Sequence, residues 1–512
     1  MIKRASSGRI LSVPLDARTS TPLHRQVYDG LRTLILDGTL RRGAPVSSTR
    51  ELAHELGVSR STVILAYKQL RDEGYLLGRM GSVTRVCATL PDLALHAAPA
   101  PAREKADAHR ATPSARAARM HTIPRRPDLT DHAPRAFRAA VPAVDMLPVD
   151  SWGRLLARRW RRASARALAY GDPFGYRPLR EAIAEYLATA RGVVCSADRV
   201  MIVNGALEAF DLACRVILDP GDVAWLEDPG YFAAHGPLTS AGARIARVRV
   251  DAHGLDVAHG RQIAPRARLA FVTPGRQFPL GVSLSLERRL ALIEWARSAG
   301  AWIFEDDYDG EFRYSGRPLA ALQGLDPDGS VIYAGTFSKV LFPALRIGYV
   351  VLPSALVDAF GAARYFLDFS SSYLEQAVLT DFITEGHFER HIRRTRAVYA
   401  ERQALLFALA RKHLAGRLTL QDADAGMTVV GWLPPGTRES EIARAASERG
   451  VDVDPLGAFA HRTMPPGLLL GYAGIRDVEI REGMGKLVRA FDDLDHARGS
   501  GRRVPRRATV QL

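Results

Sequence analysis

Apolar residues recur at helical spacing near the start of this 512-residue chain and in short runs farther along it. Between residues 22 and 36 they fit one face of a helix with about 3.6 residues per turn. Seven strand-like runs follow, mostly with helical segments between them: 201–203, 223–227, 244–250, 269–273, 302–306, 331–335 and 348–352. This alternation predicts an α/β domain with a mainly parallel sheet. We expect residues 374–497 to form a smaller α+β part, with a long helix near Phe388–Leu414.

Two helix-start signals stand between residues 48 and 62. Ser48 and Glu51 have the spacing of a capping box, in which each side chain bonds the other residue's backbone N–H. Ser59 can cap the next helix, and the inner face of that helix would consist of Val63, Tyr67 and Leu70. Residues 74–76 and 79–86 then predict a two-stranded wing. A helix, a turn, a second capped helix and a wing make a winged helix-turn-helix, whose second short helix enters the major groove of DNA.

The stretch ELAHELGVSRSTVILAY (51–67), with a glycine-bearing wing after it, resembles the DNA-binding domain of the GntR family. This resemblance places five residues at the DNA: Arg50, Arg60, Ser61 and Thr62 at contacts, and Gly81 at the wing tip. Arginine recognises guanine edges, and a helix N-terminus with hydroxyls favours a phosphate. For Arg50 the alternative is a surface charge near a helix start. Val83 stands where the family usually has a second glycine, which leaves contact of the wing with the minor groove open.

The net charge of +15 is not spread evenly along the chain. Residues 141–497 are close to neutral, with 42 Lys and Arg against 43 Asp and Glu, so the positive excess lies in the N-terminal module, the Ala/Pro/Arg-rich stretch after it and the tail. This distribution is typical of a protein that binds a polyanion. No apolar run reaches the length of about 18 residues that a membrane helix needs, and no secretory signal core follows the first residues. Together with only three cysteines, this predicts a cytoplasmic protein that does not bind membranes.

The stretch YAGTFSKVLFPALRIGYVV (333–351) presents one lysine, Lys339, among apolar residues. Burial beside a cationic neighbour lowers the pKa of a lysine and makes its amine a nucleophile toward an aldehyde. Thr336 and Ser338 before it, and Arg346 after it, can bind a phosphate. A lysine that forms a Schiff base beside a phosphate site is what pyridoxal 5′-phosphate (PLP) requires. The competing interpretation is an ordinary solvated lysine.

A carboxylate that suits the same cofactor lies upstream in WIFEDDYDGEF (302–312). Asp306 ends a buried strand, where ligands of open α/β sheets collect. There it can keep the pyridine nitrogen of the cofactor protonated, and Tyr308 can reach the ring hydroxyl. The alternatives for this acidic run are a solvated loop or a metal site. No histidine cluster accompanies it, so we expect no metal.

With these two motifs, residues 200–352 resemble the large domain of fold-type I aminotransferases. Together with its N-terminal module, the chain resembles the MocR/GabR-type transcriptional regulators. The resemblance implies a homodimer that binds PLP, with further cofactor contacts from four residues: Gly205 and Ala206 at a helix N-terminus, Tyr231 stacked on the ring, and Tyr170 serving the phosphate of the other subunit.

Two positions depart from the aminotransferase pattern. In the TPxxQFPxG loop, Arg276 stands where family members usually have histidine. Leu469 stands in the strand where a working aminotransferase places an arginine that clamps the substrate carboxylate. Three arginines are open as replacements: Arg276, Arg462 and Arg476.

These observations predict four segments: a winged helix-turn-helix at 15–87, a flexible linker at 88–138, an aminotransferase-like domain at 139–497 and a basic tail at 498–512. We expect a PLP-dependent regulator that senses a small amine, an amino acid or PLP itself, and that binds a double-stranded operator with repeated half-sites. One alternative is an active PLP-dependent aminotransferase with an accessory DNA-binding module. Another is a DNA-binding protein with a degenerate, cofactor-free large domain, against which the presence of Lys339 and Asp306 counts.

Overall fold

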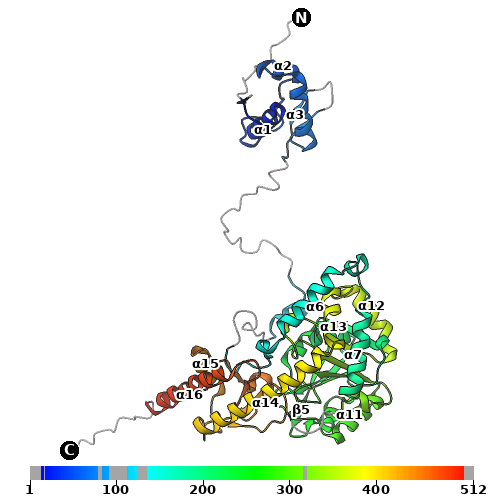
Figure 1. Cartoon of the computed structure of the whole chain (residues 1–512), viewed down its shortest axis with the longest axis vertical. Helices are drawn as coiled ribbons and strands as arrows, with labels where there is room; N and C mark the ends of the chain where they lie inside the picture. Colours follow the sequence, from blue (N-terminus) through cyan, green and yellow to red (C-terminus); the bar gives the residue numbers. More distant parts are fainter. Residues whose placement is uncertain are drawn as a thin grey trace, which may run out of the picture. The chain divides into compact units, whose positions relative to one another are not determined.

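The computed structural model describes residues 13–16, 18–78, 83–90, 112–123, 135–314 and 320–500. The chain divides into two compact units, Met1–Thr112 and Pro113–Leu512 (Figure 1). Each unit has its own hydrophobic core. Among the residues within these ranges, no helix is long and apolar enough to cross a membrane.

The first unit is a winged helix-turn-helix, as the sequence predicts. Its elements in order are α1 (Leu23–Leu36), α2 (Thr49–Glu55), α3 (Arg60–Asp72), β1 (Leu76–Leu77) and β2 (Arg85–Val86). The capping box at the start of α2 is confirmed, because Ser48 accepts from the Glu51 backbone and Glu51 accepts from the Ser48 backbone. Ser59 caps α3 by accepting from the Thr62 N–H.

The core of the first unit is built from the inner faces of its three helices. Val27, Leu31 and Val63 are almost fully buried in it. The hydroxyl of Tyr67 on α3 donates to the Ser47 carbonyl at the start of α2, at 2.8 Å. This bond and the apolar contacts set the angle between α2 and α3, and they leave the opposite face of α3 exposed.

The second unit is organised around an eight-stranded sheet in the order β3-β10-β9-β8-β7-β4-β5-β6. The strands are β3 (Val200–Val203), β4 (Val223–Asp228), β5 (Arg244–Asp251), β6 (Gly254–Leu255), β7 (Leu269–Val272), β8 (Trp302–Asp307), β9 (Val331–Thr336) and β10 (Gly348–Val351). The five strands from β9 to β5 run parallel, while β10 is antiparallel to both of its neighbours and β6 is antiparallel to β5. All seven predicted strands are therefore present, in a mainly parallel sheet.

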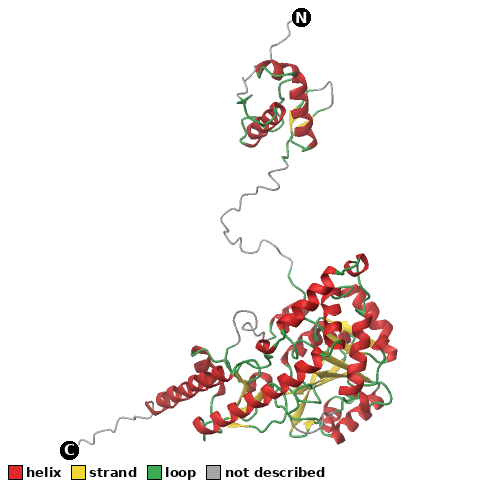
Figure 2. Ribbon diagram, viewed as in Figure 1, coloured by secondary structure: helices red, strands yellow, loops and turns green. Residues whose placement is uncertain are grey.

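Helices cover both faces of this sheet (Figure 2). They are α7 (Arg177–Ala190), α8 (Ala206–Ile217), α9 (His235–Ala241), α10 (Val257–Ile263), α11 (Leu286–Ala299) and α12 (Val357–Leu367). Successive side chains of a strand point to opposite faces. In β7, Leu269 and Phe271 accordingly enter one core, while Ala270 and Val272 enter another. Strands buried on both faces, such as β3, β7 and β10, are continuous apolar runs, whereas β5 near the sheet edge alternates.

The C-terminal part contains a second, four-stranded antiparallel sheet in the order β11-β12-β14-β13. Its strands are β11 (Thr419–Leu420), β12 (Thr428–Trp432), β13 (Asp454–Pro455) and β14 (Gly467–Gly471). Three helices accompany it: α14 (His387–His413), α15 (Glu439–Glu448) and α16 (Asp477–Ser500). The long helix predicted at 388–414 is confirmed to within one residue. Of the predicted tail at 498–512, residues 498–500 form the end of α16, and residues 501–512 lie outside the described residues.

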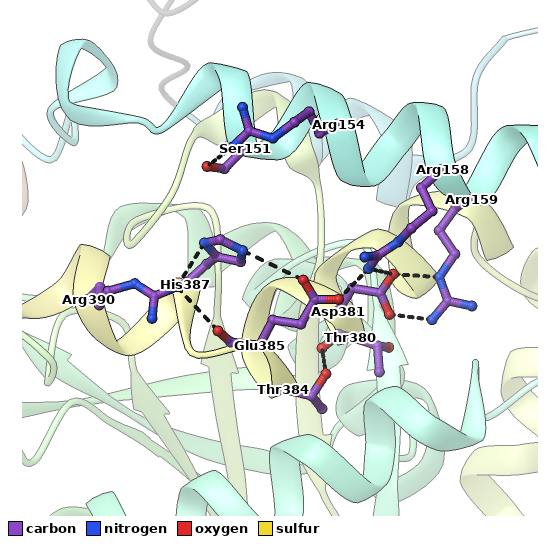
Figure 3. A network of polar contacts seen from close by, with 10 residues as sticks. All are labelled: Ser151, Arg154, Arg158, Arg159, Thr380, Asp381, Thr384, Glu385, His387 and Arg390. Atoms are coloured by element: carbon purple, nitrogen blue, oxygen red, sulfur yellow. Dashed lines mark hydrogen bonds and ion pairs between the residues drawn. The ribbon is translucent and has the colours of Figure 1, made fainter.

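Helix α6 (Val149–Arg161) is joined to α13 (Tyr373–Thr384) by a group of polar contacts (Figure 3). Arg158 and Arg159 both form ion pairs with Asp381, and Arg158 also pairs with Glu385. The carboxylate of Asp381 lies mostly buried between them. These contacts hold the segment that leads to Tyr170 against the body of the unit.

The structure differs from the predicted 88–138 linker at two places. Residues Ala115–His121 form a short helix, α5, capped by Ser114 and packed on α9. Phe137 and Arg138, at the end of the range, are buried in the second unit. The sequence does not predict either feature. Neither segment is long enough to show a helical or strand period, and both are stabilised by residues far along the chain.

Candidate functional site

The predicted cofactor residues come from strand ends that meet at one edge of the large sheet. Asp306 lies near the end of β8 and pairs with Ala334 of β9, and Lys339 follows β9 by three residues. Gly348 at the start of β10 lies between Thr336 of β9 and the end of β3. Because β3 leads directly into α8, the start of this helix is brought to the same edge.

Gly205, the N-cap of α8, has a φ of 115°, which favours glycine. A Cβ at this position would lie 3.5 Å from Nη1 of Arg346, so the guanidinium faces the start of the helix. The first N–H groups of a helix and an arginine together form an anion-binding site. Ala206 is the first residue of α8 and belongs to the same turn.

Thr336 and Ser338 lie beside this anion-binding arrangement in sequence. The Thr336 hydroxyl accepts from the Ser338 N–H at 3.2 Å. The Ser338 hydroxyl oxygen is buried and has no hydrogen-bond partner among the described residues. A buried hydroxyl without a partner is costly, and a ligand oxygen would satisfy it.

Asp306 is buried, and its Oδ1 has no hydrogen-bond partner in the part of the chain that the structure describes. Burial, the largest cause, and the neighbouring Asp307 and Asp309 together raise the pKa of its carboxyl group to about 7, although Lys339 lowers it. The site thus holds a carboxylate whose charge is poorly compensated by the protein. A cation placed at Oδ1 would both satisfy the oxygen and lower this pKa.

Lys339 is half-buried, and its Nζ donates a hydrogen bond to the carbonyl oxygen of Ala140 at 2.8 Å. Ala140 has a φ of 58°, which is unusual for a residue other than glycine. The sequence analysis missed this contact, because Ala140 follows the predicted linker and carries no motif. No local signal could have found it.

Three aromatic side chains stand near Asp306. The ring of Tyr231 lies 6.0 Å from that of Phe278, and Phe278 lies 6.1 Å from Tyr308, both edge to face. Burial, the largest cause, and Asp306 raise the pKa of Tyr231 to about 12 although Arg346 lowers it, so this ring lies within the electrostatic influence of both residues. Burial raises the pKa of Tyr308 well above its ordinary value.

Tyr170 is not brought to the buried site within one chain. It is 89% exposed, and its ring lies 5.2 Å from that of Phe369. Such exposure of a large aromatic ring suits a residue that meets another molecule.

The three arginines considered as carboxylate ligands all have protein partners. Arg276 is buried, donates to the Thr428 carbonyl at 2.5 Å and pairs with Asp309 at 3.4 Å. Arg462 donates to the carbonyls of Asp228 and Val250, while Arg476 pairs with Glu479 at the surface. Leu469 is fully buried in β14, as its predicted strand position requires.

The predicted DNA contacts lie on the exposed side of the first unit. Arg50, Arg60 and Ser61 are exposed, whereas Thr62 is half-buried and shares a hydrogen bond with the Ser59 hydroxyl. Gly81 lies outside the described residues. The sequence analysis overlooked three exposed residues that continue the face of Arg60 and Ser61 along α3: Ile64, Leu65 and Lys68.

Two families match the two parts of the chain. The family of bacterial regulatory proteins called gntR matches residues 23–86, and class I and II aminotransferases match residues 143–487. Among solved structures, the α-aminoadipate aminotransferase LysN from Thermus thermophilus, complexed with N-(5′-phosphopyridoxyl)-L-leucine, is 28% identical with a TM-score of 0.65, covering 71% of this chain and 93% of its own. A kynurenine aminotransferase from Pyrococcus horikoshii is 26% identical with a TM-score of 0.65, covering 75% and 96%.

Relatives over nearly the full length are regulators. The probable rhizopine catabolism regulatory protein MocR of Rhizobium meliloti is 43% identical over 94% of this chain and 96% of its own. The regulator TauR of Rhodobacter capsulatus is 32% identical over 92% and 96%. The chain therefore belongs to the MocR-type transcriptional regulators, in which a GntR-family DNA-binding domain precedes a domain of the class I and II aminotransferase family.

Proposed function

We propose that this regulator binds PLP at Lys339. We propose that its affinity for DNA changes when a small amine, an amino acid or PLP itself occupies that site. The observation that carries the proposal concerns Oδ1 of Asp306, which is buried, has no hydrogen-bond partner among the described residues and lies within the electrostatic influence of the Lys339 amine. A carboxylate in that state costs free energy unless a cation meets it. The protonated pyridine nitrogen of PLP is such a cation.

The residues present fit the cofactor at its other end too. Arg346 and the first N–H groups of α8, at Gly205 and Ala206, would hold the phosphate together with the hydroxyls of Thr336 and Ser338. Tyr308 would donate to the ring hydroxyl, and Tyr231 would pack on the ring. When bound, PLP supplies an aldehyde carbon that exchanges between amines.

Each residue then has a defined task in sensing. Asp306 would keep the proton on the pyridine nitrogen of a bound cofactor, and the apolar surroundings of Lys339, including Val340 and Leu341, exclude water from its amine. The amine of Lys339 would hold the cofactor, and its side chain would be released when another amine replaced it. For this exchange to be a signal, the ligand must favour one arrangement of the protein over another.

The effector is proposed as a small amine or amino acid without a more specific identity. Leu469 supplies no guanidinium to orient an amino-acid carboxylate, and the three candidate arginines are already bonded to protein groups. A carboxylate would have to compete with these partners. The names of similar regulators point to different pathways: rhizopine catabolism for MocR, and pyridoxine biosynthesis for PdxR of Corynebacterium glutamicum, which is 31% identical over 77% of this chain and 80% of its own. Their effectors therefore do not transfer to this chain.

At the DNA, we propose that Arg60 recognises a base edge and that Ser61, Thr62 and Arg50 contact phosphates. The exposed Leu65, on the same face of α3, suits an apolar contact with a thymine methyl group. We further propose a cytoplasmic homodimer, in which the exposed Tyr170 serves the phosphate of the other subunit. Two DNA-binding domains in one dimer would recognise repeated half-sites.

A second function, transamination, is favoured by the intact pair of Lys339 and Asp306. One experiment separates the two. Bound DNA is selected from a randomised library, and its affinity is measured for apo protein, PLP protein and PLP protein with each amine that changes its absorbance. Regulation by the site requires the affinities to differ. Equal affinities, together with steady conversion of the amine in the presence of a keto acid, would show that the site is catalytic instead.

A further inference from the structure

Residues 136–141, which we call the strap, connect the predicted linker to the site of Lys339. The strap enters the second unit beside the small sheet, where Ala136 forms a β-bridge with Val451 and its carbonyl accepts from the Asp452 N–H. The next carbonyl, of Phe137, accepts from the Gly471 N–H at the end of β14. Four residues after Ala136, the Ala140 carbonyl accepts from Lys339.

Three glycines of the small part make room for the strap. A Cβ at Gly471 would lie 2.0 Å from the carbonyl oxygen of Arg138, and one at Gly474 would lie 2.8 Å from that of Val141. A Cβ at Gly483 would lie 2.5 Å from the Ala136 side chain. Any larger residue at these positions would displace the strap, so its path depends on a groove that only glycine leaves open.

The strap is also held in a conformation that it would not adopt alone. Phe137 and Ala140 have φ values of 67° and 58°, a region that non-glycine residues occupy only when their surroundings enforce it. The enforcing contact is Arg138, whose buried guanidinium donates to one oxygen of Asp452 from Nε at 2.9 Å and from Nη2 at 2.6 Å. Arg138 lies between the two residues of positive φ, so its ion pair anchors the strap there.

We propose that the strap transmits the state of Lys339 to the linker, with Arg138 as the positioning residue that keeps the Ala140 carbonyl on the lysine amine. This inference rests on the proposed binding of PLP at Lys339. A free ammonium group has three hydrogens to donate, whereas the nitrogen of a Schiff base has at most one. The bond to Ala140 therefore forms when an amine has displaced Lys339 and is weakened when the lysine is attached to the cofactor.

The exchange is balanced without any oxidant or reductant. The nitrogen of the incoming amine forms a bond to the cofactor carbon, the bond from that carbon to Lys339 breaks, and protons pass from the incoming amine to the departing lysine. The strap then gains one hydrogen bond. Because residues 136–138 are the end of the predicted linker, the ordering of the strap changes the part of the linker that adjoins the second unit.

The test uses the full-length protein loaded with PLP, before and after addition of hydroxylamine. Hydroxylamine reacts with the aldehyde carbon of the cofactor and releases the lysine amine. Hydrogen exchange is followed in peptides that cover the strap, and operator affinity is measured in parallel. In the wild type, hydroxylamine should slow strap exchange several-fold and change operator affinity several-fold. Arg138→Gln should lose both responses while its absorbance still changes with hydroxylamine. Gly471→Ala, which displaces the strap by a different route, should behave in the same way.

Arg417→Gln is the matched control, because it removes another ion pair of the small part, with Asp492, away from the strap. It should respond as the wild type does. The inference is overturned if hydroxylamine leaves strap exchange unchanged in the wild type, or if both strap variants keep the full change in operator affinity. A wild type that shows no Schiff-base absorbance and no reaction with hydroxylamine would instead refute the proposed binding of PLP, and the inference with it.

Discussion

The Nζ of Lys339 lies 2.8 Å from the carbonyl oxygen of Ala140, a residue 199 positions earlier in the chain. One partner follows the central strand β9, and the other belongs to the strap, whose first residues are the end of the predicted linker. The hydrogen bond thus joins the residue with the proposed chemistry to the segment that leads to the DNA-binding domain. A sensor needs such a link between ligand and output, because a ligand shifts an equilibrium only through contacts that differ between its states.

Replacement of the lysine should abolish covalent attachment of the cofactor. We expect Lys339→Ala to show no Schiff-base absorbance after incubation with PLP, and no label at this position after borohydride reduction and mass spectrometry. Lys412→Ala, on the surface of α14, is a suitable control and should be labelled as the wild type is. A full Schiff-base band in Lys339→Ala would show that another amine carries the cofactor.

The charge of Asp306 should destabilise the apo protein as the pH rises. Its pKa of about 7 in the folded state lies above the ordinary 3.8, chiefly because of burial. Between these values the folded state holds a proton that the unfolded state has lost, so the free energy of unfolding falls with rising pH and the loss is complete above about pH 7. Asp306→Asn removes this penalty. Its apo melting temperature should equal that of the wild type near pH 4 and exceed it at pH 8, by about 2–4 °C per kcal/mol.

The same substitution should weaken binding of PLP, because an amide cannot neutralise a protonated pyridine nitrogen. Thermal melting with and without PLP, at pH 5 and pH 8, measures both effects in one series. An apo variant that melts below the wild type at pH 8 would show that Asp306 has a structural partner and is not held for a ligand.

Arg60 and Lys68 should differ in their effect on DNA binding. Both lie on the exposed face of α3, but only Arg60 stands in its first turn, where base edges are within reach. Arg60→Ala should cost about 1–3 kcal/mol on the operator and little on random DNA. Lys68→Ala should weaken both to the same degree and reduce the salt dependence of binding by about one ion. Equal losses on both DNAs for Arg60→Ala would make it a phosphate contact.

Tyr170 should act across the subunit interface. Mixed dimers of a Tyr170→Ala subunit and a Lys339→Ala subunit test this point. If Tyr170 serves the other subunit's site, the subunit that keeps Lys339 receives an intact Tyr170 from its partner and retains PLP as the wild type does. If Tyr170 acts within its own chain, the only site with a lysine lacks the tyrosine and retains PLP less well. Absorbance of the purified mixed dimer after dialysis gives the answer.

The local sequence determined the helix starts of the first unit and the strands of the large sheet. Helix caps such as Ser48 and Ser59 bond backbone groups within three residues. The starts of α2 and α3 could therefore be predicted from residues that are neighbours in the sequence. Several strands of the large sheet, among them β3, β7 and β10, are buried on both faces, so each of these is a short apolar run with a clear beginning and end. Asp306 and Lys339 could be predicted as site residues for the same reason, because the ends of such strands are where a parallel sheet collects its ligands.

Only the tertiary structure determined the features that depend on contacts between residues far apart in the sequence, namely the partners of Arg276 and the path of the strap. From the sequence alone, Arg276 could be a ligand for a substrate carboxylate. The structure shows instead that its guanidinium donates to the carbonyl of Thr428 in β12 and forms an ion pair with Asp309. The strap has no periodicity and no motif, and its path follows from a glycine-lined groove more than 300 residues later and from the pair of Arg138 with Asp452. A hydrogen bond such as that of Ala140 with Lys339 leaves no pattern in the sequence, because a backbone carbonyl is the same in every residue.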